Sequence, residues 1–182
     1  MSRAFTLIEV VITTALFTAL MVAIAQLYVV YGQVVLFQKS SIGVALGGSA
    51  IVDAVRTAGL QANQVVATHT FSGTSYSSGA TTVIFEMPAI DASGAIIGTA
   101  HDYVGITASS TNVYRLTDAA PGSARVSGTK RLTTVLSALN FTYDNASFPS
   151  VTNVTVDATT SDQVKGEVTQ RHLRERVYLR NL

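Results

Sequence analysis

The distribution of apolar residues divides the chain near residue 60 into two parts with different periodicity. Residues 5–37 contain a single charge, Glu9, and no proline, and they are rich in Leu, Val, Ala and Thr. This composition predicts a helix, and about 20 apolar residues suffice to span a bilayer. The apolar side chains beyond about Ala25 lie past the hydrocarbon. They therefore need protein to cover them.

Residues 38–60 continue the helical pattern with the mixed spacing of an amphipathic helix. Asp53 and Arg56 suit the solvent side of this helix. We expect one continuous or locally loosened helix that ends near Gly59, with that glycine as its C-cap. The positions expected to pack on a globular domain are Ile42, Leu46, Val52 and Val55.

After residue 60 apolar and polar residues alternate, as they do in β-strands. Residues 72–81 and 118–128 are predicted as loops because of their Gly, Ser and Pro content, and residues 130–140 as a strand. A long helix followed by a series of strands indicates an α+β fold, in which an antiparallel sheet packs on the amphipathic half of the helix. The other predicted strands are residues 81–87, 103–107, 112–116, 139–144, 151–158 and 173–181.

Composition and charge narrow the possible functions. The length of 182 residues suits one domain plus an anchor, and the net charge of +1 does not predict a nucleic-acid surface. The chain has no cysteine, which excludes disulfides, thiolate metal sites and a cysteine nucleophile. His69, His101 and His172 lie in separate segments, and we expect the neighbours His101 and Asp102 in a turn. We therefore predict a protein that is not an enzyme and that needs neither a metal nor a cofactor.

Glu9 is the feature that a simple membrane anchor does not explain. An acidic residue at the centre of a spanning helix costs roughly 2.5–3.5 kcal/mol, and such residues usually have a partner and a function. The nearest basic residue is Arg3, on the polar side of the boundary. The sequence offers Glu9 no partner within its own helix.

The residues around Glu9 carry a specific resemblance. The order Phe-Thr-Leu-Ile-Glu over residues 5–9, preceded by the basic Arg3 and the small Ala4, is similar to the start of type IV prepilins and type II secretion prepseudopilins. The resemblance implies cleavage between Ala4 and Phe5 by a prepilin peptidase, which also methylates the new amine of Phe5. It implies that Glu9 forms an assembly salt bridge with the N-terminal ammonium of a neighbouring subunit.

The same resemblance implies the pilin fold and a division of the chain. Residues 1–4 are the leader peptide, residues 5–37 the transmembrane and filament-core helix, residues 38–60 the amphipathic half of the helix, and residues 61–182 the β-rich head. The protein would be a single-pass protein of the inner membrane, with its N-terminus in the cytoplasm and its head outside, before it enters a pilus or pseudopilus. Its partners would be the prepilin peptidase, other pilin or pseudopilin subunits, the inner-membrane assembly platform and membrane lipid.

The chain departs from the family pattern in three ways. Ala4 stands where the family most often has glycine before the cleaved bond. The spanning helix lacks the proline often found there, and the cysteine-bracketed C-terminal loop of many major pilins is missing. The end of the chain, RERVYLRNL (residues 174–182), resembles J-type minor pseudopilins, which implies a minor subunit near the filament tip. In the family the subunit at the very end tends to lack the glutamate, so the presence of Glu9 implies a place below that end.

Three other interpretations remain open at this stage. A signal peptide cleaved after Ala25 would leave a soluble exported β-rich binding domain, and a bitopic anchor would tolerate Glu9 by snorkelling. A DNA-binding competence pilin is the third. Nucleic acid or an acidic partner could contact a basic cluster in the last predicted strand, where we otherwise expect the basic outer face of a half-exposed strand. This cluster comprises Arg171, Arg174, Arg176 and Arg180.

Overall fold

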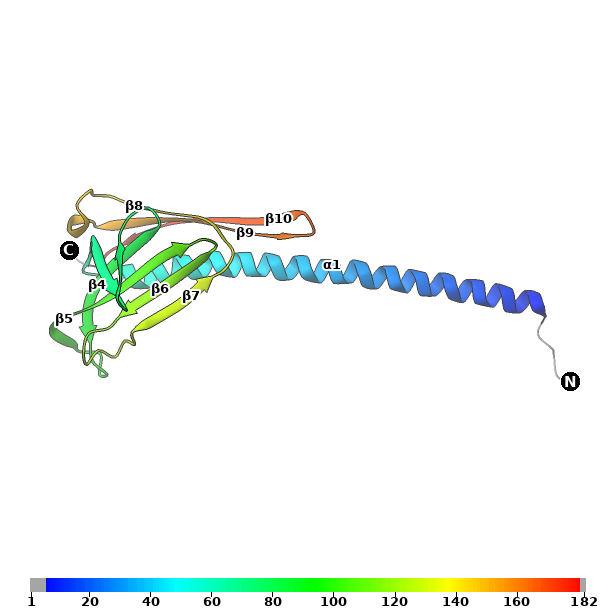
Figure 1. The fold of residues 1–182 in the computed structure, drawn as a ribbon, viewed down its shortest axis with the longest axis horizontal. Helices are drawn as coiled ribbons and strands as arrows, with labels where there is room; N and C mark the ends of the chain where they lie inside the picture. The colour runs from blue at the N-terminus through cyan, green and yellow to red at the C-terminus, as the bar shows by residue number, and fades with distance from the viewer. Residues whose placement is uncertain (1–5, 181–182) are drawn as a thin grey trace. The chain divides into compact units, whose positions relative to one another are not determined.

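The computed structural model describes residues 6–180 and confirms the α+β class. One long helix, α1 (Leu7–Gly59), is followed by β-strands that pair antiparallel throughout (Figure 1). The chain forms two compact units, Met1–Ser40 and Ser41–Leu182. The first therefore holds the N-terminal part of α1, and the second holds the rest of α1 and all the strands.

The strands of the second unit form two sheets and a separate hairpin. The five-stranded sheet has the order β1-β4-β5-β6-β7, with β1 (Gln64–Val65), β4 (Thr82–Ile90), β5 (Ile96–Ser109), β6 (Asn112–Asp118) and β7 (Gly128–Thr133). The three-stranded sheet has the order β10-β9-β8, with β8 (Leu136–Tyr143), β9 (Asn153–Val164) and β10 (Glu167–Tyr178). The hairpin joins β2 (Thr68–Phe71) and β3 (Thr74–Ser77), and a 3-10 turn, η1, covers Phe148–Ser150.

The structure corrects the predicted strand layout in two places. Residues 72–81 were expected as a loop, yet they contain β3, which pairs with β2 across a two-residue turn. Residues 130–140 are extended as predicted, but they belong to two strands, β7 and β8, which lie in different sheets. The antiparallel β-structure is therefore divided over two sheets instead of one.

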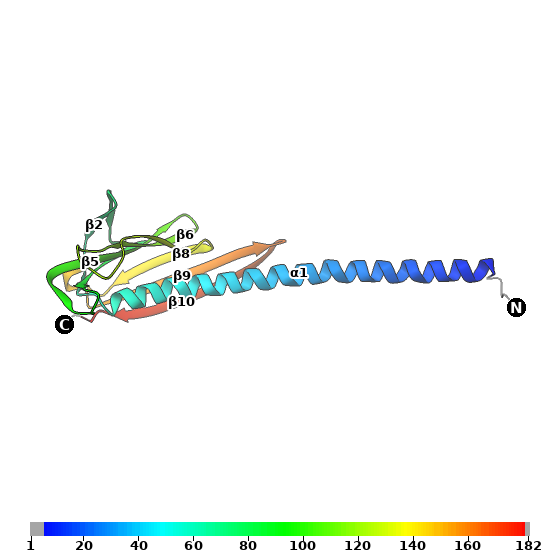
Figure 2. The same ribbon diagram turned by 90° about the horizontal axis from the view of Figure 1, so that it is seen from below.

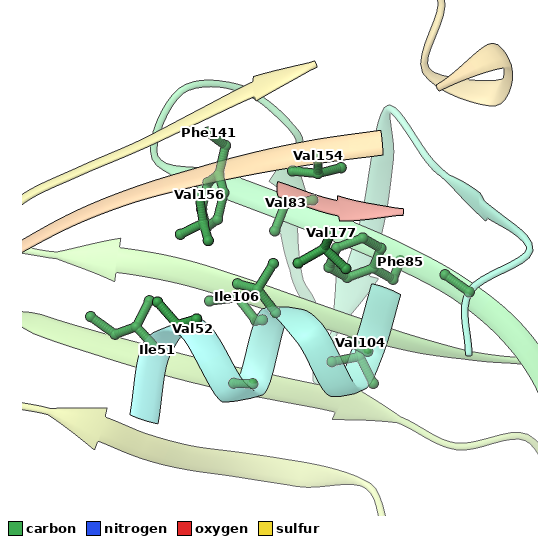
Figure 3. Packing of buried hydrophobic residues seen from close by; sticks show 14 of the residues in the cluster. Ile51, Val52, Val83, Phe85, Val104, Ile106, Phe141, Val154, Val156 and Val177 are labelled. Carbon is green, nitrogen blue, oxygen red and sulfur yellow. The ribbon is translucent and has the colours of Figure 1, made fainter. Parts of the chain in front are cut away.

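The core of the second unit lies between the C-terminal part of α1 and the two sheets. Ile51 and Val55 of α1 are fully buried. Figure 3 shows Ile51 and Val52 of α1 among side chains from both sheets. Figure 2 shows β8, β9 and β10 running along this part of the helix. The sheet residues labelled in Figure 3 are Val83, Phe85, Val104, Ile106, Phe141, Val154, Val156 and Val177.

The amphipathic face of α1 is rotated from the predicted one. Val52 and Val55 are buried as expected, but Ile42 and Leu46 are exposed, at 59% and 65% of their surface. Val44, at 1% exposed, and the small Gly47 and Gly48 take the inward positions instead. These glycines admit the sheet, because a Cβ on Gly48 would lie 2.9 Å from Cδ1 of Leu173. A pattern of large residues alone therefore identifies the wrong face where glycines provide the contact.

Gly59 ends α1 as predicted, but for a different reason from capping. Its φ is not among the positive values that a left-handed C-cap requires. A Cβ at this position would instead lie 2.6 Å from Cγ1 of the buried Val177. Glycine is needed here because β10 approaches the helix closely.

Candidate functional site

Glu9 has a hydrogen-bond partner in Thr6, the residue directly before α1, although the sequence offers no oppositely charged partner within the helix. Oε2 of Glu9 accepts hydrogen bonds from the backbone N–H and from the hydroxyl of Thr6, both at 2.9 Å. The backbone N–H of Glu9 faces Oγ1 of Thr6 in return, at 3.4 Å. This is a capping box, in which an N-cap threonine and a glutamate three residues later satisfy each other's backbone N–H groups. The sequence carries the signal for this box, Thr-x-x-Glu directly before an apolar run.

The helix that follows Glu9 is suited to an apolar environment along its exposed surface. Side chains such as Phe17 and Leu27 are more than half exposed, at 59% and 69%. The threonines satisfy their own hydroxyls, because Thr13 donates to the carbonyl of Glu9 at 2.6 Å and Thr18 to that of Thr14 at 2.8 Å. Polar groups in lipid must be satisfied internally in this way. The helix is long and apolar enough to cross a membrane, a property that signal sequences and core helices of soluble proteins share.

The predicted cleavage and methylation residues, Ala4 and Phe5, lie outside the described residues, as does the leader of residues 1–4. Processing at this bond therefore stays a prediction. The structure does describe the residues that follow this bond. Thr6, the residue after Phe5, is hydrogen-bonded to Glu9.

The predicted basic cluster in the last strand does not form one surface. Arg174 and Arg176 are exposed and share one face of β10, whereas Arg171 falls on the opposite face, in phase with Leu173. Arg180 is exposed and lies beyond the end of β10. A basic outer face is therefore formed by two of the four arginines.

Carboxylates partly neutralise this face. His172, in phase with the two arginines, has Nε2 2.6 Å from Oδ1 of Asp157. Asp157 also lies directly opposite Arg174 in the register between β9 and β10. On the other face Glu175 binds Arg56 of α1 through two bonds of 2.7 and 2.6 Å, and this contact raises the pKa of Arg56. Glu175 and His172 of β10 therefore help to hold the fold together.

His101 and Asp102 lie in strand β5 and not in a turn, which corrects the prediction from the sequence. Asp102 is fully buried and accepts hydrogen bonds from the backbone of Ala120, from the hydroxyl of Ser123 and from Nη1 of Arg125. Because a buried carboxylate is stable only when it is paired and hydrogen-bonded, Asp102 fixes the predicted loop of residues 118–128 to the sheet. Sequence reasoning missed this pair, because nothing local connects positions 23 residues apart.

A second polar group lies near the β2–β3 hairpin. The ring of His69 stacks on Tyr103 at 3.8 Å and its Nε2 lies 2.9 Å from Oδ2 of Asp118. The Tyr103 hydroxyl donates to Oε2 of Glu86 at 3.1 Å, and burial, with Glu86 close by, raises the pKa of Tyr103. These contacts join the hairpin to the five-stranded sheet. Across residues 6–180 no group of three or more His, Cys, Asp or Glu side chains is placed to hold a metal ion.

Compared with protein-family models, with curated proteins and with solved structures, the chain matches none. Its interpretation therefore depends on its own residues, chiefly the capping box at the start of a long, exposed apolar helix and the two-sheet head unit.

Proposed function

We propose that the protein is a structural subunit, and a minor one, of a type IV pilus or type II secretion pseudopilus. The observation that supports this most strongly is a carboxylate, Glu9, in the first turn of a helix whose apolar side chains stay exposed to Phe37. Other helices of the same kind would cover these side chains in a filament. A prepilin peptidase would release the chain at Ala4–Phe5, and an assembly platform in the inner membrane would extract it from the lipid. The division into an apolar helix and a β-rich head is in keeping with a pilin fold.

The capping box gives this proposal a physical route. A lone carboxylate near lipid is unfavourable, but the two donors of Thr6 already satisfy one oxygen of Glu9 before assembly. In the filament, the N-terminal ammonium of a neighbouring subunit would add a charge of opposite sign. Attraction between two such charges grows as the surrounding dielectric falls. The pair then mainly sets the register between helices, while packing of their apolar side chains supplies most of the association.

The exported soluble domain is the less favoured alternative. Cleavage after Ala25 would leave an N-terminal stretch that is still helical and still apolar. Leu27, Val29 and Phe37 are exposed at 69%, 59% and 41%. A soluble domain would present these side chains to water, and such a patch normally marks an interaction site. The DNA-binding alternative is weakened because β10 offers two exposed arginines on a face that also carries Asp157.

Three substitutions separate the two roles of Glu9. Glu9→Gln keeps a side chain that a capping box accepts but removes the charge. Thr6→Ala removes the N-cap side chain and keeps the charge. Glu9→Ala removes the charge and also the Glu9 side chain of the capping box. We expect Glu9→Gln and Glu9→Ala to reduce the yield of sheared filaments about tenfold or more, because the ammonium of the neighbour loses its partner. Thr6→Ala should assemble nearly as well as the wild type.

Membrane fractionation of the same strains provides the control, because all three variants should insert. Full assembly by Glu9→Gln would show that the carboxylate only caps the helix and that the charge pairing is wrong. N-terminal analysis of membrane material adds a second check: a chain that starts at Gln26 would contradict the pilin proposal, and a chain that starts at methylated Phe5 would support it.

A further inference from the structure

We propose that strand β7 and the basic groove beside it bind an acidic, extended segment of a different protein chain, which adds to the five-stranded sheet as a further strand. The basic groove is defined by Arg115, Lys130 and Arg131. The inference uses only the second unit, so it does not depend on how α1 assembles.

The position of β7 supplies the first part of the argument. It is the last strand in the order β1-β4-β5-β6-β7, so only its β6 side is paired. Its residues Gly128 to Arg131 are exposed. A free edge of this kind presents unpaired backbone N–H and C=O groups, and extended peptides bind to such edges by adding a strand.

The groove is hollow on both sides of a like-charge pair. Arg115 of β6 lies directly opposite Lys130 of β7 in the sheet register. Both residues line a cavity of about 300 Å³ shared with Ala50 and Ala54 of α1. Both also line a neighbouring cavity of about 360 Å³ on the side of Val126. Like charges directly opposite each other destabilise a sheet, so an anion bound between Arg115 and Lys130 would stabilise this pair.

The cations of the groove are not satisfied within the described part of the chain. Residues 6–180 place no carboxylate within 4.0 Å of Arg115, Lys130 or Arg131. Nε of Arg115 is buried and has no hydrogen-bond partner there. The single carboxylate on the wall of the groove, Asp53, contacts Arg56 instead, at 3.3 Å. A buried guanidinium N–H without a partner is unfavourable, and a carboxylate would satisfy it with a strong, charge-assisted bond.

The alternative explanation is protection against aggregation. Lysine on an edge strand discourages pairing between two like chains, and Lys130 and Arg131 fit that role. Arg115 does not, because it lies on the inner strand β6 and lines the same groove. Protection of the edge and recognition of an unlike, acidic strand are compatible, because both exclude a second copy of the same basic edge.

The chemistry of the groove favours a protein segment over nucleic acid. The walls of the two cavities contain no Phe, Tyr or Trp. Proteins that bind single strands without sequence preference rely on aromatic side chains for base stacking. A strand whose glutamates alternate with valines would place its carboxylates toward Arg115 and Lys130, and its backbone would pair with β7.

The test uses the full chain in detergent and a short fluorescent peptide that alternates glutamate with valine, followed by fluorescence anisotropy. Two control peptides have glutamine in place of glutamate, or N-methyl groups on alternate backbone nitrogens. We expect the acidic peptide to bind, and Lys130→Gln and Arg115→Gln each to weaken it about fivefold. Arg176→Gln on β10 removes the same charge elsewhere and should leave binding unchanged.

Four results would overturn the proposal. These are equal binding of the glutamine peptide, equal binding of the N-methylated peptide, an equal loss in Arg176→Gln, or tighter binding of an oligothymidine that competes for the same groove. Because Lys130 is exposed, its substitution should not disturb folding. Unchanged binding of the acidic peptide by Lys130→Gln would therefore count against the proposal even if Arg115→Gln is unstable. The peptide-binding assay does not depend on filament assembly, so its result is independent of whether the proposed function is correct.

Discussion

At the scale of single residues, three positions combine two requirements. Glu9 caps its helix through Thr6 while it carries the charge that we assign to assembly. Gly59 occupies a helical position, where alanine would be favoured, because Val177 leaves no room for a Cβ. Asp102 is a charge in the core, and its partners come from the loop that it anchors. Each residue is explained by its neighbours in space more than by its own propensity.

The glycines of α1 give a matched pair of substitutions. Gly43→Ala meets no atom within 4 Å, so it should stabilise the protein by up to about 1 kcal/mol through helix propensity. Gly59→Ala brings a Cβ to 2.6 Å from Cγ1 of Val177, so it should destabilise by about 1–3 kcal/mol. Urea unfolding of the full chain in detergent measures both. A gain in stability from Gly59→Ala would show that β10 does not press on the helix.

The buried ion pair allows a second residue-level prediction. Asp102→Ala leaves Arg125 without its carboxylate, although the Arg125 side chain is only 15% exposed. Breaking such a pair costs about 3–5 kcal/mol. The double variant Asp102→Leu with Arg125→Met should recover much of this loss, because it removes both charges together. If the double variant were as unstable as Asp102→Ala, packing and not charge would be the cause.

At the scale of elements, tight turns decide which strands pair. The β2–β3 turn consists of Ser72 and Gly73, with φ of 48° and 86°, and the β9–β10 turn consists of Lys165 and Gly166, with φ of 51° and 89°. Two-residue turns with positive φ at both positions match the twist of a hairpin. Gly73 and Gly166 supply the left-handed conformation that other residues adopt only with strain.

These elements also show how far the sequence could predict the fold. The strands around Phe85, Phe141 and Val156 follow from apolar periodicity, because these residues form the core. The helix follows from its long apolar run, and its end from the glycine at position 59. The β2–β3 hairpin was missed because its residues are mostly Ser and Thr and lack apolar alternation. The division into two sheets depends on contacts between distant residues, which a local pattern does not contain. The capping box was readable, whereas the Asp102–Arg125 pair was not.

The link between β8 and β9 predicts a dependence on pH. Asp144 accepts hydrogen bonds from the backbone of Thr152 at 3.0 Å and of Asn153 at 3.2 Å, and from the Thr152 hydroxyl. Its slight burial would raise the pKa of Asp144, but these bonds outweigh that effect and lower it. A lowered carboxyl pKa contributes stability above the unfolded value of about 3.9, and this contribution is lost as the pH falls through the folded value.

Asp144→Asn should therefore lower the midpoint of thermal unfolding by a few degrees at pH 7. The difference from the wild type should narrow as the pH falls below about 4, because the wild-type carboxylate is then protonated as well. Asp162→Asn is the control, since the Asp162 side chain accepts a single bond, from the backbone of the next residue. A difference that stays constant down to pH 2 would mean that the charge of Asp144 is not responsible.

At the scale of the whole molecule, the free edges of the sheets limit how the chain can associate with copies of itself. β7 carries Lys130 and Arg131 and no acidic residue, and β10 carries three arginines against two glutamates. β8 is partly covered, because the N–H of Phe141 donates to the carbonyl of Ala80, and β1 is two residues long. The β7 edge is thus basic, which disfavours edge pairing between like copies and favours unlike, acidic neighbours, whereas charged residues of β10 contact Arg56 and Asp157 within the chain.

Topology is a further prediction at this scale, and the absence of cysteine makes it simple to test. A cysteine placed at Ser137, an exposed position of β8, would be the only thiol of the chain. A membrane-impermeant maleimide added to intact spheroplasts should label it, because we expect the head outside the cytoplasm. The wild type, which has no thiol, is the blank. Labelling that requires lysis of the spheroplasts would place the head inside and contradict the proposed function.

We expect this subunit to make up a small proportion of a filament. A repeating subunit must contact copies of itself along the whole filament, and the basic edge β7 opposes contacts between like edges. In the pairing that we propose, Glu9 meets the N-terminal amine of a neighbour, so the chain should not occupy the extreme tip. We therefore expect a few copies below the tip, among unlike subunits.

Quantitative mass spectrometry of filaments purified from the native organism should find this chain at a much lower copy number than the repeating subunit. Two differently tagged versions expressed together should co-purify with other subunits much more than with each other. If this chain were the bulk subunit of long filaments, the minor assignment would be wrong, while the role of Glu9 in assembly would stand.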